Sequence, residues 1–122
     1  MKDSILKSIA AQHQGSVYVY EGAKIQQQYT RLKNAFSGVE KLRINYACKA
    51  LSNLSILSLI RSMGSGLDTV SIQEVQLGIK AGFRAEDIIF TPNGVSIEEI
   101  EEVAAMGVQI NIDNLSLLEQ FG

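Results

Sequence analysis

The sequence is poor in the residues on which several kinds of site depend. Its 122 residues include one cysteine, Cys48, which cannot form an internal disulfide, and one histidine, His13, which lies in the N-terminal segment. So few ligands argue against a histidine-based catalytic triad and against a metal site. No G-x-G-x-x-G or Walker pattern opens a helix, and the short Gly64–Gly66 stretch cannot cradle a phosphate.

The chain also has no excess of one charge and no long apolar run. It carries 11 basic and 13 acidic residues, a net charge of −2. This balance argues against nucleic acid as a partner, because nothing offsets the phosphate charge. The apolar runs are far shorter than the roughly 20 residues that span a bilayer, and residues 1–16 contain no secretory signal. We therefore predict a cytoplasmic protein in a reducing environment that binds neither nucleic acid nor membrane.

What is present is a regular alternation of short strands and amphipathic helices. The composition, 46% hydrophobic and 20% charged, is that of a folded protein, and the length predicts one domain. The alternation of apolar residues predicts strands at 17–20, 43–48, 67–70, 87–90 and 109–112. It predicts helices over 21–36, 54–63, 72–81 and 97–106, and from residue 115 onward.

The ends of several predicted helices are marked in the sequence. Capping-box patterns begin two helices, and glycines suited to a left-handed conformation end three. These residues are Ser71 with Glu74, Ser96 with Glu99, and Gly64, Gly82 and Gly107. From residue 43 the strands recur every 20 to 24 residues, which is typical of a parallel sheet with helical crossovers.

The strands at 43–48 and 109–113 each have one apolar and one polar face. A doubly wound sheet needs strands that are apolar on both faces, so this pattern favours an α/β fold of the TIM type. We predict a partial (β/α)8 barrel of about four βα units, preceded by an N-terminal strand and helix. A whole barrel needs about 250 residues. We therefore expect residues 1–20 to form an N-terminal segment and strand, and residues 21–122 the front half of a barrel; a small complete α/β domain is the alternative.

Lys49 stands out as a candidate catalytic residue. It follows the strand at 43–48, at the end where ligands of parallel α/β folds bind. A lysine amine in a partly dry site loses its proton more readily and can condense with an aldehyde to form a Schiff base. The alternative is a rim lysine whose charged head stays in water.

Two carboxylates lie near the next strand. Asp68 could pair with Lys49 or with a cationic ligand atom, although a turn aspartate is the simpler interpretation. Glu74 could reach the same cavity, but the capping box with Ser71 explains it as well.

Five stretches resemble a known family. They are VYVYEG, INYACKALSN, GSGLDTVSIQEVQLGIKAG, IIFTPNGVS and VQINIDNLSLLEQ, which cover the chain from Val17 to its end. In this order they resemble the N-terminal part of the diaminopimelate decarboxylases, pyridoxal-phosphate enzymes of the alanine-racemase-like barrel class. Departures include Leu51, Val95 and Ile72–Gln73, where that family often has asparagine, lysine and a pair of glycines.

The resemblance implies a coenzyme, a reaction and three site residues. Lys49 matches the lysine that binds pyridoxal 5′-phosphate covalently, and Asp68 and Glu74 match acidic residues of a motif near the coenzyme. The implied reaction is decarboxylation of meso-2,6-diaminopimelate to L-lysine, in a homodimer. The implied histidine, phosphate loop, pyridine partner and β-domain have no counterpart in these residues, so we expect the chain to be a fragment that is inactive alone.

Other functions remain open from the sequence. Within the same class they are ornithine, arginine or carboxynorspermidine decarboxylases and a racemase. A pyridoxal-phosphate-binding homeostasis protein would be a non-enzymatic alternative, but it leaves the strand at 17–20 unexplained. A receiver-like signalling domain needs an acidic pair after its first strand, where only Glu21 stands.

Overall fold

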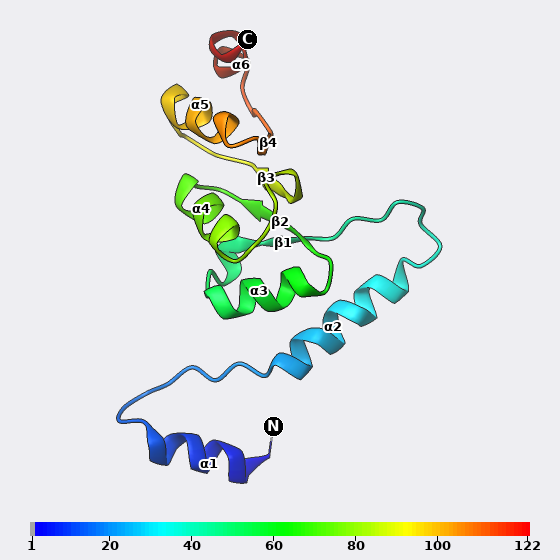
Figure 1. Cartoon of the computed structure of the whole chain (residues 1–122), viewed down its shortest axis with the longest axis vertical. Helices are drawn as coiled ribbons and strands as arrows, with labels where there is room; N and C mark the ends of the chain where they lie inside the picture. The colour runs from blue at the N-terminus through cyan, green and yellow to red at the C-terminus, as the bar shows by residue number, and fades with distance from the viewer. Residues whose placement is uncertain (1) are drawn as a thin grey trace.

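The computed structural model describes residues 2–122. Its elements in chain order are α1 (Asp3–Gln12), α2 (Gly22–Ala35), β1 (Asn45–Ala47), the 3-10 turn η1 (Cys48–Ala50), α3 (Leu54–Ser62), β2 (Gly66–Thr69), α4 (Ile72–Lys80), the 3-10 turn η2 (Ala85–Asp87), β3 (Ile88–Phe90), α5 (Ile97–Ala105), β4 (Gln109–Ile110) and α6 (Leu115–Phe121). From β1 onward every strand is followed by a helix (Figure 1), which confirms the four predicted βα units.

The four strands form one parallel sheet in the order β1-β2-β3-β4. Ala47 lies opposite Asp68, and Asp68 in turn lies opposite Ile89. Since all strands run the same way, their carboxyl ends meet at one edge of the sheet. This edge is where the predicted candidate residues follow their strands.

The helices after the first three strands cover one face of this sheet. Leu57 of α3, Val75 of α4 and Val103 of α5 are fully buried and share one core with Leu67 and Phe90 of the sheet. In Figure 1 these helices follow one another along one side of the strands. Side chains of a strand point alternately to its two faces, so the neighbours of the buried residues face away from the helices.

The opposite face of the sheet is open and partly polar. Asp68 and Ile89 are only partly buried between fully buried neighbours, and Asn111 is exposed. Helices on one face only are typical of a barrel wall rather than of a doubly wound sheet. The structure thus confirms the predicted class, an α/β fold that forms part of a (β/α)8 barrel.

The helix ends follow the predicted signals, but the glutamates of both capping boxes accept from backbone N–H groups other than that of their own serine. Ser71 and Ser96 each accept a hydrogen bond at 3.3 Å from the backbone N–H three residues on. The three predicted glycine stops all have positive φ. Glu99 does not close its own capping box, however, because its Oε1 accepts a hydrogen bond from Ile72 N of α4 at 3.1 Å. One carboxylate therefore ties the start of α4 to α5.

Replacing Glu99 by alanine should lower the free energy of unfolding by about 1 kcal/mol, because the Ile72 N–H loses its acceptor. Glu99→Gln keeps an acceptor oxygen and should cost less. Glu101, which is exposed on the same helix, is the control, and its alanine variant should stay within about 0.5 kcal/mol of the parent. Urea unfolding measures all three, and equal losses for Glu99→Ala and Glu101→Ala would contradict this role.

The N-terminal region differs from the prediction. Residues 16–21 have no regular secondary structure, so the strand expected at 17–20 is absent, and the helix α1 was not predicted. The segment is extended, and Tyr18 is 91% exposed. The β propensity of valine and tyrosine acts through packing against neighbouring strands, and this segment has no strand partner among residues 2–122.

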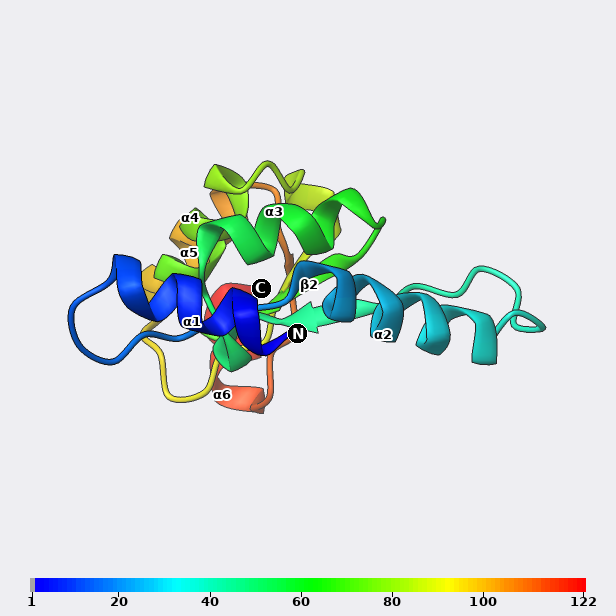
Figure 2. The same ribbon diagram turned by 90° about the horizontal axis from the view of Figure 1, so that it is seen from below.

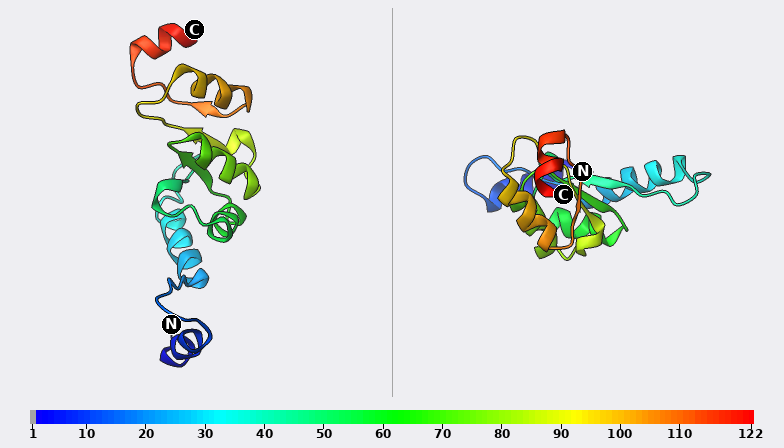
Figure 3. Two further views of the ribbon diagram at one scale, coloured as in Figure 1. Left: turned by 90° about the vertical axis from the view of Figure 1, so that its left-hand side faces the viewer. Right: turned by 90° about the horizontal axis from the view of Figure 1, so that it is seen from above.

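The N-terminal helices lie outside the buried core, although α2 contacts α3 beside the edge strand β1. Figure 2 shows α2 and the segment after it projecting beyond the strands, and Figure 3 shows α1 and α6 at opposite ends of the long axis. No residue of α1 or α2 is buried. The only core of the described chain therefore lies between the sheet and the helices α3, α4 and α5.

Candidate functional site

Lys49 lies at the carboxyl end of β1, as predicted. The strand ends at Ala47, and the turn η1 that follows is closed by a 3.1 Å hydrogen bond from Leu51 N to Cys48 O. Within this turn Cys48 is fully buried, whereas Lys49 is exposed. The buried cysteine anchors the turn to the core, and the lysine side chain beside it is open to solvent.

The partly dry surroundings expected for Lys49 are not found in this chain. Its side chain is exposed, and within residues 2–122 no ion pair joins it to Asp68. The sheet face beside it carries no covering element, so water reaches the amine. The structure thus places Lys49 on the strand next to that of Asp68 without bringing the two groups into contact.

Tyr46 supports the turn that carries Lys49. Its hydroxyl donates a hydrogen bond to Leu51 O at 3.2 Å, just beyond the lysine. Burial, and then the nearby Cys48 and Tyr20 groups, raise the pKa of Tyr46 above its usual value. The hydroxyl therefore keeps its proton at neutral pH and remains a donor to the turn.

Cys48 is a packing residue, fully buried in the core. Burial, and then the negative charge of Glu74, raise the pKa of Cys48 to about 11. The thiol is the protonated form at neutral pH, and a protonated thiol is a poor nucleophile. It contributes apolar contact to the core and no reactive group to the site.

A row of hydrogen-bonded polar side chains crosses the open face at the strand ends. Thr91 Oγ1 donates to Asp68 Oδ1 at 3.1 Å, and Asn111 Nδ2 donates to Thr91 Oγ1 at 3.1 Å. The backbone sets this alignment, because Thr91 N and Asn111 N continue the strand ladders with bonds of 2.8 Å to Thr69 O and Phe90 O. Of the three residues in this row, only Asp68 was predicted from the sequence, because the alignment of Thr91 and Asn111 with it depends on the strand register.

Glu74 lies at the start of α4 and bonds to the backbone. Its Oε2 accepts a hydrogen bond from Val70 N at 2.9 Å, and its own N–H donates to Ser71 Oγ. Of the two interpretations of this residue, the structure supports helix capping. A role for Glu74 toward a ligand remains a prediction.

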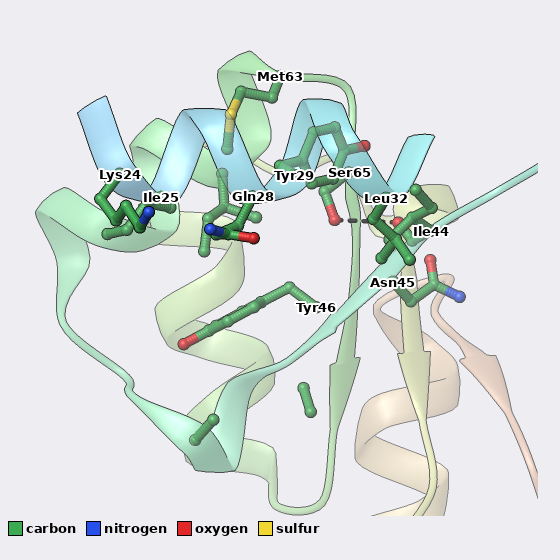
Figure 4. A pocket seen from close by; sticks show the side chains of 13 residues that line it. Lys24, Ile25, Gln28, Tyr29, Leu32, Ile44, Asn45, Tyr46, Met63 and Ser65 are labelled. Carbon is green, nitrogen blue, oxygen red and sulfur yellow. Dashed lines mark hydrogen bonds between the residues drawn. The ribbon is translucent and has the colours of Figure 1, made fainter. Parts of the chain in front are cut away.

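An apolar groove of about 500 Å³ lies on the other side of β1, between that strand, α2 and α3. Figure 4 shows Ile25 and Tyr29 of α2 above it, and Tyr46 of β1 below it. Neither Asp68 nor Lys49 lines it. The groove is thus part of the packing of α2 against the sheet, and the polar row lies elsewhere.

The chemistry available at the strand ends is that of an amine, a carboxylate and neutral hydrogen-bonding groups. Among residues 2–122 there is no cluster of histidine, cysteine and acidic side chains that could hold a metal. None of the helices in this range combines the length and apolarity needed to cross a bilayer. An accessible primary amine suits a ligand with a carbonyl group, because a lysine amine forms covalent bonds with carbonyl carbons.

Comparison with known families places the chain among the pyridoxal-dependent decarboxylases. The family described as "Pyridoxal-dependent decarboxylase, pyridoxal binding domain" matches residues 22–122. The chain belongs to this family. Its match begins with α2 and includes all four strands, Lys49, Asp68, Thr91 and Asn111.

Members of this family with high similarity include diaminopimelate decarboxylases. That of Helicobacter pylori strain J99 is 43% identical over 103 residues, which are 84% of this chain and 25% of the relative. A crystal structure of the Helicobacter pylori enzyme complexed with L-lysine superposes with a TM-score of 0.88 at 38% identity, covering 95% of this chain and 29% of that one. A lysine/ornithine decarboxylase from Vibrio vulnificus, complexed with putrescine, has a TM-score of 0.87 at 26% identity, with 97% and 32% covered.

The matched region is only part of each relative. The chain spans about a quarter of the length of the curated relatives it matches. It contains the lysine and aspartate at the ends of the first two strands, together with the helices that hold these strands in place.

Proposed function

We propose that this chain forms the coenzyme-lysine part of a pyridoxal-phosphate-dependent carboxy-lyase that converts meso-2,6-diaminopimelate to L-lysine. The observation that carries the proposal is the position of Lys49 at the carboxyl end of β1, inside the matched pyridoxal-binding region. Similarity to diaminopimelate decarboxylases over 84% of the chain supports the substrate.

The residues at the strand ends fit the aldehyde end of the coenzyme. Lys49 offers an accessible amine, and Ala47, opposite Asp68 in the ladder, has a small side chain that leaves room beside it. Lys49 would hold the coenzyme covalently, and Asp68 would lie beside it as an acceptor; Glu74 is a further candidate. When bound, pyridoxal phosphate supplies an aldehyde for the amine and a ring that withdraws electrons from the reacting carbon.

This chain's own contribution to the reaction is to bind the coenzyme and to transfer protons. Lys49 would hold the coenzyme covalently through its Nζ atom, and the same atom would take up a proton when the substrate amine replaces it. Asp68, as a carboxylate on the next strand, favours the positively charged form of a nearby nitrogen. Overall, the bond between the substrate α-carbon and its carboxylate breaks, CO₂ leaves, and the carbon takes up one proton.

A second candidate is a decarboxylase for another basic amino acid, such as ornithine or arginine, or carboxynorspermidine. The similarity to the lysine/ornithine decarboxylase of Vibrio vulnificus favours keeping this alternative.

The proposal also includes a cytoplasmic location and a homodimer. We expect the 122 residues alone to release little or no CO₂, since the polar face of the sheet is open to water.

A hybrid enzyme tests the decarboxylase role. In this hybrid, residues 22–122 replace the matching quarter of the Helicobacter pylori enzyme, to which the chain is 43% identical. We expect the hybrid to release CO₂ from labelled meso-diaminopimelate, and its Lys49→Ala form to release none above background. A hybrid that folds and binds the coenzyme but decarboxylates equally well without Lys49 would contradict the proposal.

Substrate preference is measured on the chain itself. Pyridoxal phosphate is first bound to the 122-residue chain. The candidate amino acids meso-diaminopimelate, ornithine and arginine are then added in turn, and borohydride traps the coenzyme that remains on Lys49. If the proposal is right, meso-diaminopimelate displaces the coenzyme at a lower concentration than ornithine or arginine. Displacement by ornithine at the lowest concentration would favour the second candidate.

A further inference from the structure

Three polar side chains at the ends of three successive strands form a chain of hydrogen bonds in which each donor points toward Asp68. The chain of hydrogen bonds runs from Asn111 at β4, through Thr91 after β3, to Asp68 of β2, with both distances 3.1 Å. Asp68 lies opposite Ala47, two residues before Lys49. The row therefore ends beside the strand that carries the proposed coenzyme lysine.

The direction of the row follows from the number of protons available. An ionised carboxylate only accepts hydrogen bonds, so the single hydroxyl proton of Thr91 has to point at Asp68. The Thr91 oxygen can then only accept from its other neighbour, which requires the amide nitrogen of Asn111 to face it. The Asp68 carboxylate thus sets the direction of the Thr91 proton, and the Asn111 amide holds the Thr91 oxygen from the other side.

We infer that Thr91 and Asn111 are positioning residues that orient the Asp68 carboxylate toward Lys49. This inference rests on the proposed function. Thr91 occupies Oδ1 of Asp68, and within residues 2–122 no hydrogen bond reaches the other carboxylate oxygen, Oδ2. Oδ2 is therefore the Asp68 oxygen that remains open to a further donor, and the bond from Thr91 to Oδ1 restricts rotation of the carboxylate.

A purely structural role does not account for this row. Thr91 and Asn111 are exposed on the open face, where water can replace both bonds. Thr69, by contrast, is fully buried and bonds to Ile89 O at 2.9 Å, as expected for a threonine that serves folding. Loss of the Thr91 hydroxyl should consequently weaken coenzyme binding at Lys49 and leave the melting temperature nearly unchanged.

Four variants of the 122-residue chain test the inference, with pyridoxal 5′-phosphate as the probe. We expect Thr91→Val to raise the dissociation constant, and to slow borohydride-trapped adduct formation at Lys49, by about three- to tenfold. Thr91→Ser keeps the hydroxyl and should restore both values. Asn111→Ala should have a smaller effect, and Asn111→Asp the largest, because a second acceptor competes for the single Thr91 proton and adds a negative charge.

A double substitution tests whether Asn111 acts through Thr91. If it does, adding Asn111→Ala to Thr91→Val causes no further loss, whereas independent roles would multiply the two losses. Thr30→Val, an exposed threonine on α2, is the matched control and should bind the coenzyme as the parent does. The melting temperature should shift by no more than about 4 °C in any of these variants.

The outcomes separate this inference from the proposed function. If the parent chain forms no adduct at Lys49, the proposed function fails, and the inference with it. If the parent forms the adduct but Thr91→Val matches it, or Thr91→Ser fails to restore binding, the inference is overturned while the proposed function stands. An NMR spectrum without coenzyme gives a second readout, because the Asn111 side-chain amide signals should shift in Thr91→Val and return in Thr91→Ser.

Discussion

Replacing Lys49 by alanine should abolish the covalent attachment of pyridoxal phosphate at the end of β1. The amine is the only nitrogen nucleophile on the turn η1, whose sequence is Cys48-Lys49-Ala50, and alanine offers none in its place. In the hybrid enzyme, loss of proton transfer by this nitrogen alone should lower kcat by about 10²- to 10⁴-fold. Loss of the covalent hold on the coenzyme adds to that deficit.

Lys80 provides the matched control for this substitution. It is an exposed lysine at the C-terminal end of α4, away from the strand ends that carry the candidate site. Intact mass after borohydride treatment at limiting coenzyme should show the adduct in Lys80→Ala and lack it in Lys49→Ala. Circular dichroism of both variants should match the parent, since neither side chain is buried.

Replacing Phe90 by alanine should have the largest effect on stability. Phe90 of β3 is fully buried in the core shared by the sheet and its helices. Removing a buried ring loses its transfer free energy and leaves a cavity, which together cost about 3–5 kcal/mol. Small domains are stable by only about 5–15 kcal/mol, so urea unfolding should show a much lower midpoint or no cooperative transition.

The control for Phe90 is Phe121, which is 40% exposed at the end of α6. Phe121→Ala removes the same ring and should cost about 1 kcal/mol or less, because much of that ring is already in water. Similar losses in the two variants would mean that the core does not lie between the sheet and the helices α3, α4 and α5.

The helices and strands from residue 22 onward could be predicted because their signals are local. Apolar spacing and a terminal glycine mark α3, α4 and α5, and all three glycines have the expected positive φ. The segment 17–20 has equally strong strand composition, but a strand also needs a partner along its edge, and no local pattern supplies that. The helix α1 begins without a side-chain cap, so it lacked the capping-box pattern that marks α4 and α5.

The site was predictable only in part, for a related reason. The strand pattern was enough to place Lys49 at the carboxyl end of β1, but not to show that its side chain is exposed. The row from Asn111 to Asp68 depends on how three strands are aligned, and the bond from Ile72 to Glu99 depends on how two helices pack. Contacts between distant segments are set by register and packing, which a single sequence does not state directly.

Peptide mapping of the reduced adduct tests the central claim most directly. The chain has seven lysines, and each could react with an aldehyde in excess, so pyridoxal phosphate is added below the protein concentration before borohydride. The account predicts that Lys49 carries most of the pyridoxyl group. An adduct spread evenly over the seven lysines, or concentrated on one away from the strand ends such as Lys80, would contradict it.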